Sequence, residues 1–433
     1  MTNIPPRILF ISSANPLVGP GIIGMEQYQQ FKNAGFEIDM MTLYPVKDHP
    51  EILYVYEKKK EPSIWKKIKN KYHRLTNTTL PGIPYFFFYR KESRPPVPIS
   101  IVLKKISKEY DLLVIYFWQW MLSFRTVNAI YEKLNHPVVF FVAPDYSHMS
   151  GGCHFPGDCI RYQIGCGCCP AIHSNNKNDF THWNVKYREK IYEKIKPIVF
   201  GNSYMQSFYQ KSLLLRNART VIGKYVANTE LFKPMDKQRL RTKYQVNDEV
   251  DFIIAFGCQR LNDVSKGMVY LFQALQLLHD SMKQQERKKV LLLVAGYSFK
   301  EIQQFLPFQS KELGMIPITQ LSEFYSLADV FVCPSVNDAG PSMVLQSITC
   351  GTPVVGFEMG AMIDFVKDKG TGYCAKYKDC YDLFNGINHY LKMSREERKT
   401  VSIHCRNMVV KTYTLEAKIK QWLDLFEKYR NNS

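Results

Sequence analysis

Two polar residues eight positions apart, Asp338 and Gln346, stand where a loop opens a helix. The loop follows the apolar run 328–335, and the helix leads to a second apolar run after the break at Gly351-Thr352-Pro353. This order predicts one βαβ step of a parallel sheet. The loop and the helix start would lie at the carboxyl edge of that sheet, where open α/β folds bind ligands and free helix N–H groups suit an anion. The pattern therefore predicts a site for an anionic ligand.

A similar step lies upstream, with two cations at its turn. An apolar run, 252–256, leads into Gly257 and then Arg260, and Lys266 precedes a helical run over 268–278. The next buried strand is expected over 290–295, before Gly296 and Tyr297. Taken alone, an Arg and a Lys in a loop are more often solvated charges than ligands.

Cysteines are concentrated in the glycine-rich segment 151–170. Cys153, Cys159, Cys166 and Cys169 follow the spacing C-x5-C-x6-C-x2-C, and the last pair has the chelate spacing of four-thiolate zinc sites. This spacing predicts a structural zinc site, with Cys168 or His154 as substitute ligands. Free thiols or a disulfide are the alternatives, because the first spacing is wider than zinc sites usually have.

Length and composition bound the class of protein. A chain of 433 residues with 45% hydrophobic residues predicts two domains. No apolar run approaches the roughly 18 to 20 residues that span a bilayer, and the N-terminus lacks the apolar region of a signal peptide. We therefore expect a cytoplasmic protein, in which most of the 11 cysteines are reduced thiols or metal ligands.

Several segments together resemble a known family. Residues 328–357 resemble the donor-site signature of family-four retaining glycosyltransferases with the GT-B fold, in which acidic residues occupy both positions of the eight-residue spacing. Residues 252–278 resemble the strand, glycine turn and Arg/Lys pair that hold the donor diphosphate, and 228–234 resemble the interdomain segment. The Gly-Gly-Cys-His sequence at 151–154 resembles an insert found in a polysaccharide-biosynthesis subgroup.

The resemblance implies an α/β fold of two Rossmann-like, doubly wound parallel-sheet domains that face a cleft. The expected domains are an acceptor-side domain over 1–228 with the insert 151–170, a donor domain over 229–411, and a terminal segment, 412–433, whose helix packs back on the first domain. Strands of the first domain are expected at 8–12, 38–43, 112–116, 138–142 and 198–200.

The resemblance also implies roles for individual residues. The expected catalytic residues are Asp338, Arg260, Lys266 and Asp145. The expected donor-binding residues are Gly257, Arg260, Lys266, Gly296, Tyr297, Ser342, Met343, Val344 and Gln346, and Gly19, Gly21 and His148 are expected on the acceptor side. The family works without a catalytic metal, so cations and helix N–H groups must meet the charge of the leaving nucleotide.

The chain departs from the family at Asn228, where an aspartate is usual, and at three positions of the expected site. Pro144 stands where relatives carry a histidine that reaches the donor sugar, so that role is lost or moved to Asp145 or His148. Gln346 replaces a glutamate, although an amide carbonyl can still accept from ribose hydroxyls. Asp338 keeps the carboxylate of the usual glutamate with a shorter reach.

A net charge of +18 attracts anionic partners. The densest basic run is 58–74, where Trp65, Ile68, Tyr72 and Leu75 fall at helical spacing, and an aromatic segment follows at 83–89. This pattern predicts an interfacial helix on an anionic membrane, and the alternative is an ordinary solvated basic face. Nucleic-acid binding is not expected, because no recognition motif accompanies the charge.

The resulting interpretation is a retaining glycosyltransferase, peripheral on the inner face of the cell membrane. It would transfer a sugar from a nucleoside-diphosphate sugar to a lipid-linked or oligosaccharide acceptor in cell-surface polysaccharide biosynthesis. The Pro144 and Gln346 changes leave two alternatives open, a non-catalytic GT-B protein that binds a nucleotide or glycan, and a nucleotide-sugar epimerase.

Overall fold

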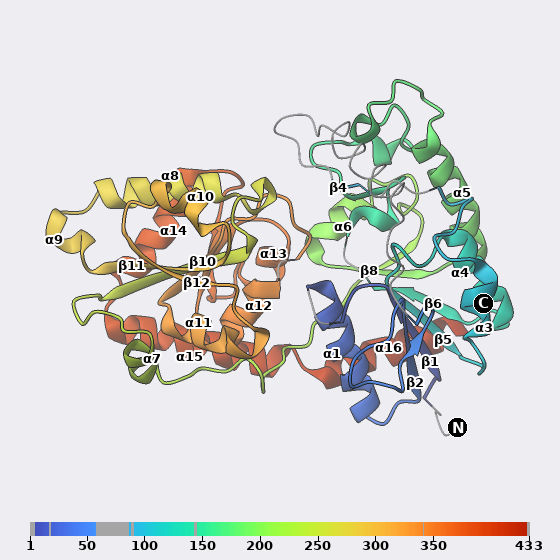
Figure 1. The fold of residues 1–433 in the computed structure, drawn as a ribbon, viewed down its shortest axis with the longest axis horizontal. Coiled ribbons are helices and arrows are strands. Elements are labelled where there is room, and N and C mark those ends of the chain that lie inside the picture. Colours follow the sequence, from blue (N-terminus) through green and yellow to red (C-terminus); the bar gives the residue numbers. More distant parts are fainter. Residues whose placement is uncertain are drawn as a thin grey trace. The chain divides into compact units, whose positions relative to one another are not determined.

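The structure is a computed structural model that describes residues 5–16, 19–57, 86–87, 91–142, 145–340 and 342–430. The chain divides into two compact units (Figure 1). Unit 1 comprises residues 1–201, 205–224 and 415–433, and unit 2 comprises residues 202–204 and 225–414. The chain thus leaves unit 1, builds most of unit 2, and returns to unit 1 for its last helix.

Unit 1 is built on a seven-stranded sheet of order β3-β2-β1-β5-β6-β8-β9, in which every pair is parallel. Its strands are β1 (Ile8–Ser12), β2 (Ile38–Thr42), β3 (Leu53–Tyr54), β5 (Leu112–Phe117), β6 (Val138–Phe141), β8 (Ile198–Gly201) and β9 (Arg219–Ile222). Its helices are α1 (Pro20–Asn33), α3 (Ile99–Lys104), α4 (Phe124–Lys133), α5 (Phe180–Ile195) and α16 (Leu415–Tyr429), with α6 (Ser203–Tyr209) where the two units meet along the chain. A short antiparallel pair joins β4 (Phe86–Phe87) to β7 (Cys153–Phe155).

Both faces of this sheet are covered by helices. On one face, Ile8 and Phe10 of β1 pack with Phe31 of α1 and with Trp422 and Phe426 of α16. On the other face, the ring of Phe141 in β6 lies 5.5 Å from that of Phe124 in α4 and 6.0 Å from that of Tyr192 in α5. Burial on both faces explains why these strands read as nearly continuous apolar runs.

Unit 2 is built on a six-stranded parallel sheet of order β12-β11-β10-β13-β14-β15. Its strands are β10 (Phe252–Arg260), β11 (Val290–Tyr297), β12 (Gln309–Gly314), β13 (Val330–Cys333), β14 (Val354–Phe357) and β15 (Gly372–Ala375). Its helices are α7 (Lys237–Lys243), α8 (Met268–Asp280), α9 (Gln284–Arg287), α10 (Phe299–Ile302), α11 (Leu321–Leu327), α12 (Ser342–Thr349), α13 (Ala361–Phe365), α14 (Cys380–Lys392) and α15 (Arg395–Thr412).

Successive side chains of β10 point to opposite faces of the sheet, and unit 2 has a core on each face. Phe252, Ile254 and Phe256 belong to a cluster completed by α8 and α14. Ile253 and Ala255 belong to a second cluster that includes residues of α7, α11, α12 and α15. Figure 1 shows α8 and α10 along one face of this sheet and α7, α11 and α15 along the other. The predicted fold class, two doubly wound α/β units with parallel sheets, is confirmed.

Candidate active site

The order of the strands in unit 2 reverses between β10 and β13, which are neighbours in the sheet although β11 and β12 lie between them in the chain. Ligands of open α/β sheets bind beyond the carboxyl ends of the strands at such a switch point. Lys266, in the 3-10 turn Val264–Lys266, follows β10, and Asp338 follows β13. Two of the predicted catalytic residues therefore flank the switch point of unit 2.

These two residues form an ion pair. Nζ of Lys266 lies 2.6 Å from Oδ2 of Asp338, and their side chains are 28% and 15% exposed. Burial by itself lowers the pKa of Lys266, but the charge and the hydrogen bond of Asp338 outweigh burial and raise it above its ordinary value. A permanent ammonium is thus held at the edge of the sheet.

The backbone around this pair is fixed by close approach of the two loops. The amide of Val336 donates to the carbonyl of Ser265 (2.9 Å), and that of Asn337 donates to the same carbonyl (3.1 Å). Gly267 has φ 67°, and a Cβ atom there would lie 1.9 Å from the carbonyl oxygen of Pro334. Only glycine fits at this contact, which holds the Lys266 turn against the loop that carries Asp338.

The predicted glycine turn also lies at this edge. Arg260 ends β10 and pairs in register with Tyr297 at the end of β11. A Cβ atom at Gly296, which has φ 135°, would lie 2.0 Å from the carbonyl oxygen of Cys258, and one at Gly257 would lie 2.6 Å from that of Ala295. The side chain of Arg260 is exposed, and within the described residues it has no ion pair. Its guanidinium group is available to an anion.

The first turns of α12 carry the remaining predicted donor residues. Ser342 and Met343 are half-buried, whereas the side chain of Val344 is fully buried, so it can contribute only through its backbone. Oε1 of Gln346 accepts a hydrogen bond from the hydroxyl of Tyr325 (3.0 Å). The amide carbonyl that the sequence assigned to ribose thus has a protein partner already, although a carbonyl oxygen can accept a second hydrogen bond.

Unit 1 has a switch point of its own, between β1 and β5. Beyond the neighbouring strand β6, Asp145 is 4% exposed and its Oδ1 accepts from the amide of Ser147 (2.6 Å). Oδ2 of the same carboxylate lies 3.1 Å from Nδ1 of His154 in β7. Burial raises the pKa of Asp145, but the charge and hydrogen bond of His154 outweigh burial and hold this pKa below its ordinary value.

The residue paired with Asp145 is therefore His154 and not His148. His148 is fully buried, and its ring lies 4.9 Å from that of Phe141 in the core. His154 is 17% exposed at its side chain and packs against Phe155, with ring centroids 4.3 Å apart. We predicted His154 only as a substitute metal ligand, because sequence alone does not place β7 beside the turn after β6.

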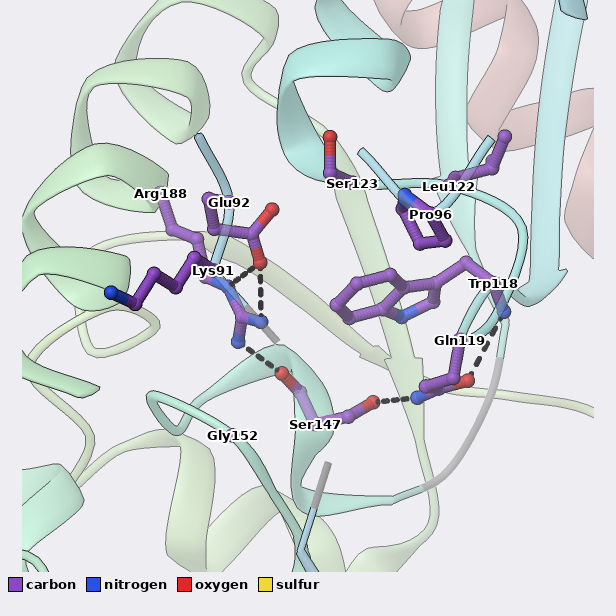
Figure 2. A pocket seen from close by; sticks show the side chains of 10 residues that line it. All are labelled: Lys91, Glu92, Pro96, Trp118, Gln119, Leu122, Ser123, Ser147, Gly152 and Arg188. Carbon is purple, nitrogen blue, oxygen red and sulfur yellow. Dashed lines mark hydrogen bonds and ion pairs between the residues drawn. The ribbon is translucent and has the colours of Figure 1, made fainter. Parts of the chain in front are cut away.

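A buried ion pair braces the turn that carries Asp145 (Figure 2). Nε and NH2 of Arg188 donate to Oε1 of Glu92 (2.8 and 2.6 Å), and NH1 donates to the carbonyl of Ser147 (2.7 Å). Glu92 Oε2 also accepts from the amide of Phe124 at the start of α4 (2.6 Å). The sequence did not single out these residues, although an arginine among Val185, Ile191 and Tyr192 on the buried face of α5 is a signal of such a pair.

The predicted acceptor-side glycines lie at the start of α1. Gly19 precedes the helix with φ 51°, and a Cβ atom at Gly21 would lie 1.8 Å from the carbonyl oxygen of Asn15. Both glycines have a structural reason to be there, and their role in acceptor binding stays a prediction.

The predicted zinc site is not supported. Among the described residues, which include all five cysteines of the insert, no group of three or more His, Cys, Asp or Glu side chains is placed to hold a metal ion. Sγ of Cys166 accepts from the amide of Gly151 (3.2 Å). Burial raises the pKa of Cys166 to about 12 and that of Cys169 to about 11.

Two predictions fall outside the described residues. They are the basic and aromatic stretch, of which 58–85 and 88–90 are not described, and Pro144 at the position of the family histidine. Among the helices that the structure does describe, none is both long enough and apolar enough to cross a membrane.

The donor-side geometry coincides with a family match. The family described as "Glycosyl transferases group 1" matches residues 236–407, which include the Lys266–Asp338 pair, the glycine turns and α12. The matched segment lies within unit 2 and covers most of it. The lipopolysaccharide 1,2-N-acetylglucosaminetransferase of Salmonella typhimurium is 23% identical over 266 residues, which cover 56% of this chain and 67% of that protein. In the next two curated relatives the matched segment covers 40% and 64% of the relative's length.

Solved structures of glycosyltransferases have the same fold along nearly the whole chain. The sucrose-phosphate synthase of Thermosynechococcus elongatus aligns with a TM-score of 0.67 at 18% identity, covering 98% of this chain and 99% of that one. The Alr3699/HepE protein of Anabaena, solved in complex with UDP-glucose, aligns with a TM-score of 0.62 at 14% identity over 98% of this chain and all of that one. These likenesses establish the GT-B fold of the chain, and the matches together support a glycosyltransferase enzyme.

Proposed function

We propose that this protein is a retaining glycosyltransferase that transfers a sugar from a nucleoside-diphosphate sugar to a lipid-linked or oligosaccharide acceptor in cell-surface polysaccharide biosynthesis. The observation that carries the proposal is the Lys266–Asp338 pair at the switch point of unit 2, inside the segment that matches the family. The similar proteins include a lipopolysaccharide transferase and a protein solved with UDP-glucose, which support the proposed classes of acceptor and donor.

In the proposed reaction, Lys266 and Arg260 contact the diphosphate of the donor. They stabilise the negative charge that develops on the nucleotide as the bond to the sugar breaks, a role for which preorganised cations are suited. The carboxylate of Asp338 accepts from a hydroxyl of the donor sugar, and the backbone amides at the start of α12 face the same ligand. The acceptor hydroxyl attacks from the face that the nucleotide leaves, which retains the configuration of the sugar.

We assign acceptor binding to the carboxyl edge of unit 1, where Asp145 and His154 lie.

The basic and aromatic stretch at 58–89 is proposed to hold the protein on the anionic inner face of the cell membrane. Each basic residue near such a surface contributes about 1 kcal/mol to binding. Neutralising Lys66, Lys67, Lys69 and Lys71 together should therefore lower the partition coefficient of the protein on anionic vesicles by well over tenfold. Unchanged co-sedimentation of this variant would remove the membrane from the proposal.

Nucleotide binding gives the direct test of the donor site. UDP, GDP, ADP and CMP are screened by thermal shift, because a ligand at 100 times its dissociation constant stabilises the protein by about 2.7 kcal/mol. Lys266→Ala should abolish the shift produced by the preferred nucleotide. Lys243→Ala is a matched control, since Lys243 on α7 forms its ion pair with Glu323 of α11 (2.5 Å), away from the carboxyl edge.

Turnover separates the proposal from its alternatives. The sugar donors of the preferred nucleotide are incubated with and without a lipid-linked acceptor, and products are identified by mass spectrometry and NMR. Transfer with retained configuration supports the proposal. An isomerised donor indicates an epimerase, and binding without turnover on the whole donor panel indicates a non-catalytic nucleotide-binding protein.

A further inference from the structure

An exposed indole stands at the switch point of unit 1 in a strained backbone conformation. Trp120 follows β5, which is the strand beside β1 where the order of the sheet reverses. Its φ is 74°, and among the described residues with positive φ it has the largest side chain. Its side chain is nonetheless 48% exposed. Strain of this kind persists only where the surrounding structure imposes it, and it is concentrated at functional sites.

The strain arises because Trp120 occupies a position of positive φ in a tight turn. The amide of Met121 donates to the carbonyl of Trp118 (3.2 Å), so Trp120 is the third residue of a four-residue turn. Positive φ at this position is typical of a type II turn, in which glycine or asparagine is favoured. A bulky tryptophan there costs free energy in the folded state, because its Cβ is strained at positive φ.

The rest of the turn is firmly held (Figure 2). Trp118 is buried beside Arg188, whose guanidinium carbon lies 5.1 Å from the indole ring. The side chain of Gln119 accepts from the amide of Trp118 (3.1 Å) and donates to Oγ of Ser147 (2.7 Å). The carbonyl of Gln119 accepts from the hydroxyl of Ser13 after β1. The neighbouring strands thus fix the direction in which the chain presents Trp120.

The same network links Trp120 to the polar groups of this edge. Gln119, next to Trp120, binds Ser147, whose amide is held by Asp145, and Asp145 contacts His154. An exposed aromatic ring, in a turn that is hydrogen-bonded to the turn of Asp145, matches a pyranose ring, which has an apolar face of C–H groups and a rim of hydroxyls.

We propose that Trp120 is a stacking platform for a sugar ring of the acceptor, and that it determines the specificity of this side of the enzyme. This inference rests on the proposed function and names a residue of its acceptor site. Trp120 touches the substrate but exchanges no proton with it, because an indole ring has no group that titrates at physiological pH.

The test measures sugar binding without turnover. Methyl glycosides of glucose, galactose and N-acetylglucosamine are titrated against the full-length protein by saturation-transfer NMR. We expect ring-proton signals from at least one glycoside in the wild type, a dissociation constant at least tenfold higher in Trp120→Ala, and near wild-type affinity in Trp120→Phe. Trp183→Ala is the matched control and should bind like the wild type, because Trp183 is 61% exposed on the regular helix α5 of the same unit.

A substitution to glycine separates a binding role from a structural one. Trp120→Gly should lose affinity for the glycoside and keep or raise the Tm, since glycine adopts positive φ without strain. No binding of any glycoside by the wild type, or equal affinity in the wild type and Trp120→Ala, overturns the proposal, as does a lower Tm with unchanged affinity. Glycoside binding that persists while no donor turns over would instead count against the proposed function.

Discussion

Nδ1 of His154 lies 3.1 Å from Oδ2 of Asp145 at the carboxyl edge of unit 1. The two residues are separated by the turn after β6, and β7 brings the imidazole back to the carboxylate. A carboxylate of this kind fixes the orientation and tautomer of the ring that it contacts. The pair therefore behaves as one functional group, and its members should be tested together.

We expect Asp145→Ala and His154→Ala to lower kcat/KM for transfer by similar factors. The double variant should be little worse than either single one, because each change removes the same arrangement. A double-mutant cycle on kcat/KM measures this coupling. His148→Ala should instead lower the Tm, because His148 is fully buried. Additive losses from Asp145→Ala and His154→Ala would show that the two side chains act independently.

Arg260→Ala and Lys266→Ala should each lower transfer by roughly two to three orders of magnitude, as removal of one preorganised donor to a developing charge does. Both should also weaken binding of the free nucleoside diphosphate, since the contacts exist before reaction. Isothermal titration and initial rates measure the two effects, with Lys243→Ala as the control. Near-full activity of both variants on a verified donor would refute the donor site.

Asp338→Asn should affect nucleotide binding and sugar transfer differently. Lys266 is released from its ion pair by this change, so the nucleoside diphosphate should bind at least as tightly as in the wild type. Transfer should fall, because the carboxylate that accepts from the donor sugar is lost. The comparison needs only the dissociation constant of the nucleotide and kcat. Weaker nucleotide binding together with unchanged kcat would show that Asp338 supports nucleotide binding and does not act on the donor sugar.

Gln346→Ala should raise the KM for the donor more than it lowers kcat. The hydrogen bond from Tyr325 orients the amide, so Tyr325→Phe should raise the same KM by a smaller factor. Kinetics at varied donor concentration test both variants, and circular dichroism controls for loss of α12. If Tyr325→Phe raises KM while Gln346→Ala does not, the buried hydroxyl of Tyr325 affects donor binding by a route other than Gln346.

Lys418 predicts a pH dependence of stability in unit 1. Burial lowers the pKa of Lys418 to about 7 in the folded protein, whereas an unfolded lysine keeps its ordinary value near 10.5. Between these values the unfolded chain binds the extra proton, so stability rises with pH by up to about 1.4 kcal/mol per unit. Lys418→Met should be more stable than the wild type near pH 7 and should lack this rise.

Urea unfolding at pH 7 and pH 9 measures the difference between Lys418→Met and the wild type. Tryptophan fluorescence isolates the relevant unit, because every tryptophan described by the structure belongs to unit 1. Subtraction of the two proteins cancels the other groups that titrate in this range. If the free energy of unfolding changes equally between pH 7 and pH 9 in both proteins, Lys418 stays charged in the folded state.

Much of the fold follows from the sequence because the central strands are buried on both faces. The apolar runs at 252–256, 290–295, 328–335 and 354–357 correspond to β10, β11, β13 and β14. The edge strand β12 was missed, since its sequence Gln-Ser-Lys-Glu-Leu-Gly has one large apolar side chain. The edge strand β15 was missed as well, because it has only four residues and one fully buried side chain.

The residues of the candidate site could be named from the sequence, but the contacts between them could not. Lys266 and Asp338 each stand at a recognisable βα turn, yet their pairing depends on which strands are neighbours, and the local pattern contains no such information. The same limit applies to His154, which reaches Asp145 only through β7. For the cysteines, spacing indicates the length of chain between thiols but not how the Sγ atoms are placed, and no group of three or more potential ligands among the described residues supports the zinc prediction.

The return of the last helix to unit 1 has a consequence for synthesis on the ribosome. Trp422 of α16 lies 4.6 Å from Phe31 and 5.6 Å from Phe140, measured between ring centroids, so the core of unit 1 is incomplete until α16 is made. Apart from residues 202–204, unit 2 is one uninterrupted stretch, 225–414, so its core can be completed earlier. We therefore expect the usual order, in which the N-terminal domain folds first during translation, to be reversed. Until α16 is made, the nascent unit 1 would expose the part of its apolar core that Trp422 and Phe426 cover, and such a surface favours binding by chaperones.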